Sequence, residues 1–342
     1  MKPYIFTFLV LLFISPTLKS QNNPKSFLVM YYNVENLFDT IDDKTINDNE
    51  FLPSSKKKWD SDRYYKKLEN LSKVILATDS SQIPDIIGLA EIENKSVLKD
   101  LCRTLHYQKP VYQYIHEDSE DPRGIDVALL YIPNRFSIIT WQKVPVFSPV
   151  TDKSKARNML YVKGISASGD TLHVFVAHWK SRIGGMEGTE TQRVFAAMSL
   201  KGKCDSILAI NQSANIIITG DFNDDPENKS VFQILQANNK RKNRDAFELF
   251  NLYFDLHNFY GAGTILYENN WYLFDQIIIS NNLLINTKGM HVRPDAGSIL
   301  KHEWMLYNPD NPKQYKPKPT YKGNEYIGGF SDHLPVFVKF YY

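Results

Sequence analysis

Short apolar runs recur along this chain, and each of them ends abruptly in polar residues. Such runs predict strands that are buried in a sheet and whose polar ends lie at one edge. The runs are Ser26 to Tyr32, Ile86 to Ala90, Val127 to Ile132, Phe136 to Trp141, Met159 to Ile165, Leu172 to Ala177, Ile216 to Ile218, Leu273 to Ile279 and Leu334 to Phe340. Pro133 and Asn134 predict a hairpin between two of them, and Ser168 to Asp170 predicts a turn between two others.

Helical patterns are fewer than strands. Apolar positions three and four residues apart mark helices around Leu68 to Ile75, around Cys102, around Val194 to Cys204 and near Val231 to Ala237. Thr189 and Gln192 have the spacing of a capping box at the start of the third helix. Many strands with few helices predict an α/β fold in which two sheets pack face to face and the helices lie outside.

The first twenty residues have a different pattern. Lys2 gives a positive start, an apolar run extends from Tyr4 to Ile14, Pro16 ends it, and Ser20 offers a small residue for cleavage. This is typical of a secretory signal peptide, and the run is too short to span a membrane. The sequence therefore predicts a signal peptide over residues 1–20, one domain over 21–342, secretion or export to a periplasm, and no stable membrane span.

Composition limits the classes of partner. Without residues 1–20, which hold Lys2, Lys19 and no acid, the 40 basic residues fall to 38 and face 38 acidic ones. A balanced charge argues against a polycationic grip on nucleic acid but allows a local basic groove. The Lys- and Tyr-rich segment from Gln314 to Tyr326 is interpreted either as a wall of such a groove or as an exposed insertion. Cys102 and Cys204 lie in helical patterns, which fit buried thiols as well as a disulfide.

The strand end from Ile216 to Pro226 carries the clearest candidate chemistry. Alternation along the strand turns Asp221 and Asn223 to the same side and Phe222 to the other. A carboxylate and an amide so placed can hold a water molecule or a hard cation beside a substrate oxygen. An Asx turn is the ordinary alternative, and the recurrence of acids and imidazoles at other strand ends favours the functional interpretation.

Other strand ends add acids, imidazoles and cations. Glu91 follows a buried run and is a plausible ligand of Mg²⁺ or Mn²⁺. His178 begins a loop that also contains Lys180 and Arg182, a combination that suits proton transfer with phosphate binding.

Two acid-imidazole pairs are predicted from the remaining strand ends. Asp332 and His333 are adjacent and face opposite ways in an extended chain, so each needs its own partner. Asp332 suits a metal, and Asp275 is the candidate partner of His333. Asp126 begins a strand and is the candidate partner of His178. Two such pairs beside a metal carboxylate would form a site for phosphoester hydrolysis.

The whole set resembles a known family. The ordered motifs are Asn33 to Phe38, Glu91, His178 to Ser181, Gly220 to Asn223 and Ser331 to His333. They are similar to those of the deoxyribonuclease I-like endonuclease/exonuclease/phosphatase superfamily, and the first and third resemble its predicted secreted nucleases. The resemblance implies a four-layered α/β sandwich with the site at one rim of the two sheets.

The resemblance also implies roles for single residues. Glu91 would be the principal Mg²⁺ ligand, helped by Asn33 and Asp332, and Mn²⁺ is the alternative cation. Asp221 and Asn223 would hold water and phosphate, while the pairs His333 with Asp275 and His178 with Asp126 would handle protons. Arg157 resembles a phosphate-contacting arginine of the family. Gly124 stands where some nucleases have a tyrosine, and either imidazole or Asp221 is a candidate base.

Three functions follow from this interpretation. The first is a secreted, Mg²⁺-dependent nuclease with DNA or RNA as substrate and no obligate protein partner. The second is a phosphatase or phospholipase-like hydrolase that acts on inositol phosphates, sphingolipid head groups or small phosphodiesters, since one fold supports many substrates. The third, a binding module without activity, is disfavoured because the polar residues that catalysis needs are all in the chain.

Overall fold

The computed structural model describes residues 25–107, 112–147, 157–285, 288–308 and 315–342. The predicted signal peptide, residues 1–20, lies outside the described residues and stays a prediction. Within these ranges, no helix combines the length and the apolar character that a membrane crossing requires.

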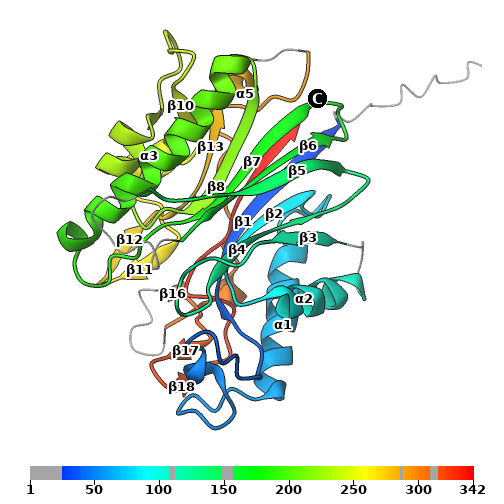
Figure 1. Cartoon of the computed structure of the whole chain (residues 1–342), viewed down its shortest axis with the longest axis vertical. Coiled ribbons are helices and arrows are strands. Elements are labelled where there is room, and N and C mark those ends of the chain that lie inside the picture. Colours follow the sequence, from blue (N-terminus) through cyan, green and yellow to red (C-terminus); the bar gives the residue numbers. More distant parts are fainter. Residues whose placement is uncertain (1–24, 108–111, 148–156, 286–287, 309–314) are drawn as a thin grey trace, which may run out of the picture.

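Two sheets form the centre of the molecule (Figure 1). The first sheet has the strand order β14-β19-β1-β2-β4-β3, and its strands are β1 (Ser26–Leu37), β2 (Ile86–Ile92), β3 (Gln113–His116), β4 (Asp126–Tyr131), β14 (Ser298–Ile299) and β19 (Val336–Tyr341). The second has the order β5-β6-β7-β8-β13-β10-β9, and its strands are β5 (Phe136–Val144), β6 (Met159–Ser166), β7 (Thr171–His178), β8 (Asn215–Asp221), β9 (Ala237–Asn238), β10 (Leu249–Asn251) and β13 (Asp275–Ser280).

Helices and short hairpins complete the fold. The α-helices are α1 (Ser61–Leu76), α2 (Lys95–His106), α3 (Met186–Ile210), α4 (Phe254–Tyr260) and α5 (Asn282–Ile285). Two 3-10 helices, η1 (Asn49–Phe51) and η4 (Glu303–Met305), and one π-helix, η3 (Ser230–Ile234), lie in the connections. The hairpins are β11 (Ile265–Tyr267) with β12 (Asn270–Tyr272), β15 (Leu306–Tyr307) with β16 (Lys316–Pro317), and β17 (Tyr321–Lys322) with β18 (Glu325–Tyr326).

Three apolar clusters bind these elements into four layers. One lies between the sheets and joins Val29 and Val338 of the first sheet to Val174 and Ile277 of the second. The second packs α1 and α2 on the outer face of the first sheet, and the third packs α3 on the outer face of the second. Figure 1 shows α3 on one side of the paired sheets and α1 and α2 on the other. The predicted α/β sandwich with outer helices is confirmed.

Two local predictions are wrong. The strands on either side of Pro133 and Asn134 do not form a hairpin, because β4 pairs with β2 and β3 whereas β5 pairs with β6. The chain crosses there from one sheet to the other. The helix α3 begins at Met186, before the predicted cap, and the Thr189 hydroxyl donates to the Gly185 carbonyl. The turn at Ser168 to Asp170 does join antiparallel strands, β6 and β7.

A buried ion pair holds the segment that precedes the last strand. The Lys67 ammonium, on α1, lies 3.9 Å from the Glu35 carboxylate and donates to the hydroxyl of Thr320 and the carbonyl of Phe330. Glu35 also accepts the backbone N–H groups of Thr320 and Tyr321. Lys67 and Glu35 are both buried. The segment before Ser331 is therefore anchored to β1 and α1.

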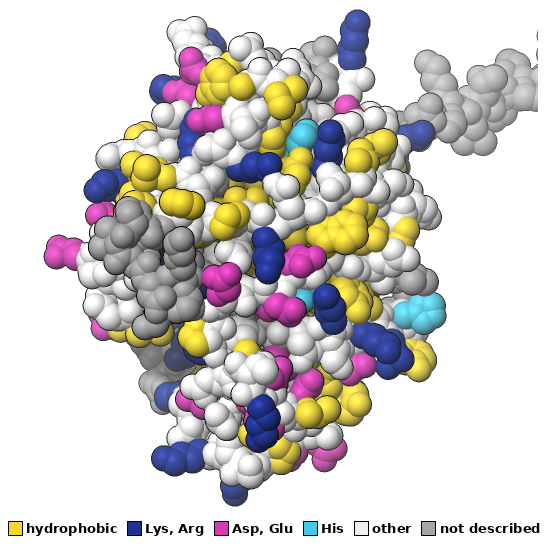
Figure 2. All heavy atoms as spheres, viewed as in Figure 1, with side chains coloured by type: hydrophobic (Ala, Val, Ile, Leu, Met, Phe, Trp, Pro, Cys, Tyr) yellow, Lys and Arg dark blue, Asp and Glu magenta, His cyan; other side chains and the backbone are white. Residues whose placement is uncertain are grey.

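The Lys- and Tyr-rich segment is packed in part: Pro317 to Tyr321 is buried or half-buried, whereas Tyr315 and the residues from Lys322 to Glu325 are exposed. Its described part places the Tyr321 ring 5.9 Å from that of Trp59, and Lys57 lies over the Tyr321 ring. Gln314, the first residue of the predicted groove wall, lies outside the described residues. On the face drawn in Figure 2, basic and acidic side chains alternate among the coloured residues, and neither sign covers that face. The mixture of signs on this face agrees with a balanced net charge.

Candidate functional site

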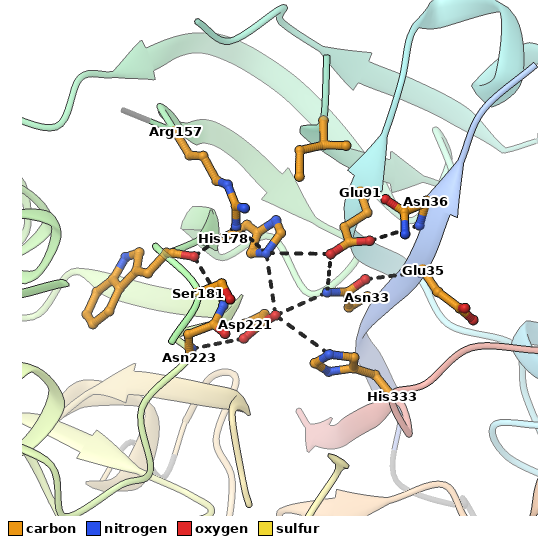
Figure 3. Close-up of polar contacts among 12 residues, drawn as sticks. Asn33, Glu35, Asn36, Glu91, Arg157, His178, Ser181, Asp221, Asn223 and His333 are labelled. Atoms are coloured by element: carbon orange, nitrogen blue, oxygen red, sulfur yellow. Dashed lines mark hydrogen bonds and ion pairs between the residues drawn. The ribbon is translucent and has the colours of Figure 1, made fainter. Parts of the chain in front are cut away.

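Five strand ends meet at one rim of the sandwich. In the first sheet, the regular parallel pairing of β1 with β2 ends where Asn33 is opposite Ala90, the residue before Glu91. In the second, the parallel pair β7 and β8 ends with His178 opposite Asp221. Asp275 begins the antiparallel strand β13 and is also paired with Asp221. Because the carboxyl ends of parallel strands lie at the same edge, these polar side chains converge (Figure 3).

Backbone irregularities occur beside two of the site residues, Glu91 and Asn223. The register between β1 and β2 shifts after Asn33, and the register between β2 and β4 shifts around Glu91. Glu91 has a φ of 63°, and Asn223, just after β8, has a φ of 50°. Such bulges and left-handed residues redirect side chains and often occur at functional sites.

Asn33 links the two carboxylates at the centre of the site. Its amide Nδ2 donates to Glu91 Oε1 at 3.3 Å and to Asp221 Oδ2 at 3.1 Å. Its Oδ1 accepts from the Glu35 N–H at 3.0 Å, and Glu91 Oε2 accepts from the Asn36 N–H at 2.9 Å. Asn33 was expected to bind a metal through its oxygen, but that oxygen faces its own loop in this arrangement.

His333 and Asp275 form the predicted pair. The Nδ1 of His333 lies 2.7 Å from Asp275 Oδ2, and its Nε2 lies 3.9 Å from Asp221 Oδ2. The Ser331 hydroxyl accepts from the His333 N–H and donates to the Asn33 carbonyl, which fixes the turn before β19. All three titratable groups are buried.

The predicted pair of His178 with Asp126 is wrong. Asp126 Oδ2 lies 3.2 Å from His116 Nε2, because the loop before β4 turns that carboxylate toward β3. His178 Nε2 instead contacts the Arg157 guanidinium, which also donates to the Trp179 carbonyl at 2.9 Å. His178 Nδ1 has no hydrogen-bond partner among the described residues. Arg157 therefore takes the place expected for a carboxylate and holds the imidazole as an acceptor.

The two imidazoles are pushed toward opposite protonation states. Burial and the Arg157 charge lower the pKa of His178 well below its ordinary value. Burial alone would lower the pKa of His333, but Asp275 and Asp221 raise it well above that value. Burial also raises the pKa of Asp221 to about 6. Asp221 Oδ2 lies 3.5 Å from His178 Nε2 and faces a neutral imidazole on one side and an imidazolium on the other.

The oxygen donors on the Glu91 side fit a hard cation. Glu91 is partly exposed, Asp332 is exposed, and the two carboxylates interact electrostatically. Carboxylate oxygens are the ligands that Mg²⁺ uses in proteins. Asp221, Asp275 and His333 also have ligand atoms within 4.8 Å of one another and form a second group that could hold a metal ion. Glu91 and Asp332 as metal ligands stay a prediction.

The loops after β7 and β8 hold the other predicted contacts. Asn223 donates from its backbone to Asp221 Oδ1 at 2.9 Å and from its side chain to the Trp179 carbonyl at 3.1 Å. Asn223 thus joins the Asp221 strand end to the His178 loop. Lys180 is exposed on that loop, and its contact with phosphate stays a prediction.

The predicted phosphate contact of Arg182 is corrected to a structural role. Its guanidinium donates to the carbonyl of Asn223 at 2.8 Å, to Asp224 at 3.1 Å, to Asp225 at 3.3 Å and to Asn228 at 2.7 Å. Two carboxylates already balance its charge. Arg182 therefore fixes the loop that follows Asp221.

The same loop contains a pH-sensitive contact. His257 Nε2 lies 3.6 Å from Asp225 and 3.5 Å from Glu227, while its Nδ1 lies 2.9 Å from the Ala262 carbonyl. Burial opposes protonation, but the hydrogen bond and charge of Glu227 raise the pKa of His257 to about 9. Its stabilising contribution is complete below the unfolded pKa of about 6.5 and is lost as the pH rises through 9.

We expect His257→Gln to lower the free energy of unfolding by about 1–2 kcal/mol at pH 6, after allowance for solvent screening and for the opposing charge of Arg182. The difference should shrink to a few tenths at about pH 10. Urea unfolding of both proteins at the two pH values measures it. An equal loss at both pH values would show that the imidazole charge contributes nothing.

Some site residues gave no signal in the sequence. Asp121 accepts from Arg157 Nε at 3.0 Å, although Asp121 lies in a polar loop that resembles any other. Lys67 looks like a solvated helix residue until its buried position is known. The Asn33 motif did contain Glu35, and this acid was the one available hint.

A family model described as "Endonuclease/Exonuclease/phosphatase family" matches residues 28–341. The chain belongs to the endonuclease/exonuclease/phosphatase family. A comparison with curated proteins finds no match.

Solved structures of similar fold cover nearly the whole chain. An endonuclease/exonuclease/phosphatase family protein from Bacteroides thetaiotaomicron has 20% identity and a TM-score of 0.57, over 93% of this chain and 98% of that one. A mannosyl-6-phosphatase from the same organism has 19% identity and a TM-score of 0.58, over 92% and 100%. TDP2 from D. rerio, in complex with a single-strand DNA product, has 14% identity and a TM-score of 0.56, over 93% and 99%. At these identities the likeness shows the fold. The family and the buried acid and histidine clusters establish the chain as a phosphoester hydrolase.

Proposed function

We propose that this family member is an exported, Mg²⁺-dependent nuclease that hydrolyses phosphodiester bonds in DNA or RNA. The observation that carries the proposal is the position of Asp221 Oδ2, 3.5 Å from His178 Nε2 and 3.9 Å from His333 Nε2. Burial lowers the pKa of His178, whereas Asp275 and Asp221 raise the pKa of His333 against the effect of burial. A carboxylate so placed can take a proton from water, while the His333 imidazolium on one side and Arg157 behind His178 on the other neutralise the charge that develops on the phosphate.

Each residue of the site has a task in this proposal. Asp221, with a pKa raised to about 6, accepts the proton of the attacking water. Asn33 orients Asp221, and Asp275 holds the His333 imidazolium beside it. Arg157 neutralises charge on the His178 side. Mg²⁺ bound by Glu91 and Asp332 would act as a Lewis acid on the phosphate.

A nucleic-acid substrate is supported by the cations that flank His178. Arg157 is buried against the imidazole, and Lys180 is exposed on the following loop. Because the net charge is balanced, local groups of this kind have to contact the sugar-phosphate backbone. Few contacts imply modest affinity and a shallow dependence on salt.

The substrate is tested by incubating purified mature protein with Mg²⁺ and plasmid DNA, RNA, sphingomyelin or inositol phosphates. We expect cleavage of plasmid or RNA, complete loss with EDTA, and recovery when Mg²⁺ is restored. Glu91→Gln should lose Mg²⁺ binding in isothermal titration while it stays folded. Phosphate release from a small substrate without strand cleavage would replace the nuclease with a phosphatase.

Export is tested separately. The secreted form is expected to begin near Gln21, because the signal peptide is predicted to end at Ser20. N-terminal sequencing of the protein from medium or periplasm measures this. Recovery from the cytoplasm with Met1 still in place would contradict export without affecting the proposed chemistry.

A further inference from the structure

Asp121 holds two arginines side by side at the His178 edge of the site. Its Oδ2 accepts from Arg157 Nε at 3.0 Å and lies 3.3 Å from Arg123 Nη2, while its Oδ1 lies 3.3 Å from Arg123 Nε. Asp121 and Arg157 are buried, whereas the Arg123 side chain is 49% exposed. The Asp121 carboxylate thus accepts hydrogen bonds from two guanidinium groups. The inner one, of Arg157, contacts His178, and the outer one, of Arg123, reaches solvent.

The loop that presents Arg123 is fixed by its own contacts. The Arg123 N–H donates to Asp121 Oδ1 at 2.9 Å, and the Asp121 N–H donates to the Ser119 hydroxyl at 3.2 Å. Gly124 has a φ of +65°, and a Cβ there would lie 2.3 Å from Ile46 Cδ1. A larger residue at Gly124 would be strained by the positive φ and would require the Ile46 side chain to shift. Arg123 is presented from a preorganised turn, which reduces the entropy cost of binding a ligand.

The charge of Arg123 acts electrostatically on the His178 imidazole in the site. It contributes, after burial, Arg157 and His333, to the lowered pKa of His178. Asp121 balances only one of the two guanidinium charges, so the pair carries a net positive charge toward the rim. Planar guanidinium groups bind phosphate oxygens in pairs of hydrogen bonds.

We propose that Arg123 is a substrate-binding residue that contacts the phosphate next to the scissile one on a nucleic-acid strand, and that Asp121 is the positioning residue for Arg123 and Arg157. This inference rests on the proposed nuclease function. The inner Arg157 serves the reacting phosphate beside His178. The outer Arg123 binds the neighbouring phosphate of the strand, and this contact favours substrates with several phosphates over substrates with one.

The test compares a short single-stranded oligonucleotide with bis(p-nitrophenyl) phosphate, which has one phosphate. For Arg123→Ala, kcat/KM for the oligonucleotide divided by kcat/KM for bis(p-nitrophenyl) phosphate is expected to fall about tenfold. The slope of log KM for the oligonucleotide against log salt should fall by about 0.7, the contribution of one phosphate contact on a single strand. Arg123→Lys should keep most of the slope, since it keeps the charge.

Arg293 provides the matched control. It forms a similar fork with Asp295, through Nε at 3.0 Å and Nη2 at 2.6 Å, in an exposed position. Arg293→Ala should leave the ratio and the slope as in the unchanged protein. An Arg123→Ala protein with both values unchanged would overturn the inference. Failure of the unchanged protein to cleave any oligonucleotide would instead overturn the proposed function.

Discussion

Asp221→Asn is expected to lower kcat at least about 10³-fold on any substrate that the protein hydrolyses, because the amide cannot accept a proton from water. Asn33, His178 and His333 all face this one carboxylate. Steady-state rates at saturating Mg²⁺ measure the change. The loss should appear in kcat and in kcat/KM alike, since the proton transfer belongs to the transition state.

Stability separates this loss from misfolding. Burial raises the pKa of Asp221 to about 6, so the ionised carboxylate destabilises the folded chain at neutral pH. We therefore expect the thermal midpoint of Asp221→Asn, measured with EDTA present, to be equal to or higher than that of the unchanged protein. Retention of more than a tenth of the activity would exclude Asp221 as the base.

Lys67→Met is expected to lower the free energy of unfolding by about 3–5 kcal/mol at pH 8, because it leaves the Glu35 carboxylate buried without a cation. The pKa of Glu35 is already raised to about 7 by burial and by the Asp332 charge, with Lys67 opposing both. The loss should be smaller at pH 5, where the carboxyl is protonated. Urea unfolding at both pH values measures it.

A second variant tests the cause. Combining Lys67→Met with Glu35→Gln removes both charges, and we expect it to recover at least half of the lost stability. If the double variant is as unstable as the single one, the packing of the lysine chain and its hydrogen bonds to Thr320 and Phe330 would be the stabilising contribution instead.

The layers of the fold were predictable because strands and helices have different periods. The runs around Val29 and Val174 have the continuous apolar character of buried strands, and both face the central core. The crossing at Pro133 and Asn134 was not predictable, since a two-residue connection between two strands suits a hairpin within one sheet as well as a crossing between sheets. Which sheet a strand joins depends on pairing partners that are distant in the sequence.

The site was predictable wherever a strand delivers the residue. Asp221, Asp275 and Glu91 were placed by the strands that end or begin with them. The partner of His178 was not, because Asp121 lies in the middle of the loop that leads to Asp126, and the conformation of this loop decides which of the two carboxylates faces the site. Loop conformation is set by turns such as that at Gly124, and apolar periodicity carries no information about it.

The left-handed backbone of the site has a consequence for how this protein can change over time. Glu35, Asn36, Glu91 and Asn223 all have φ between 50° and 63°. Each costs on the order of 1 kcal/mol, which glycine would avoid. A laboratory population selected for heat resistance alone should therefore drift toward glycine at Asn36 and Asn223. Glycine at 223 would keep the backbone hydrogen bond to Asp221 and lose the side-chain hydrogen bond to the Trp179 carbonyl, so heat-resistant descendants would lose the link between the Asp221 strand end and the His178 loop.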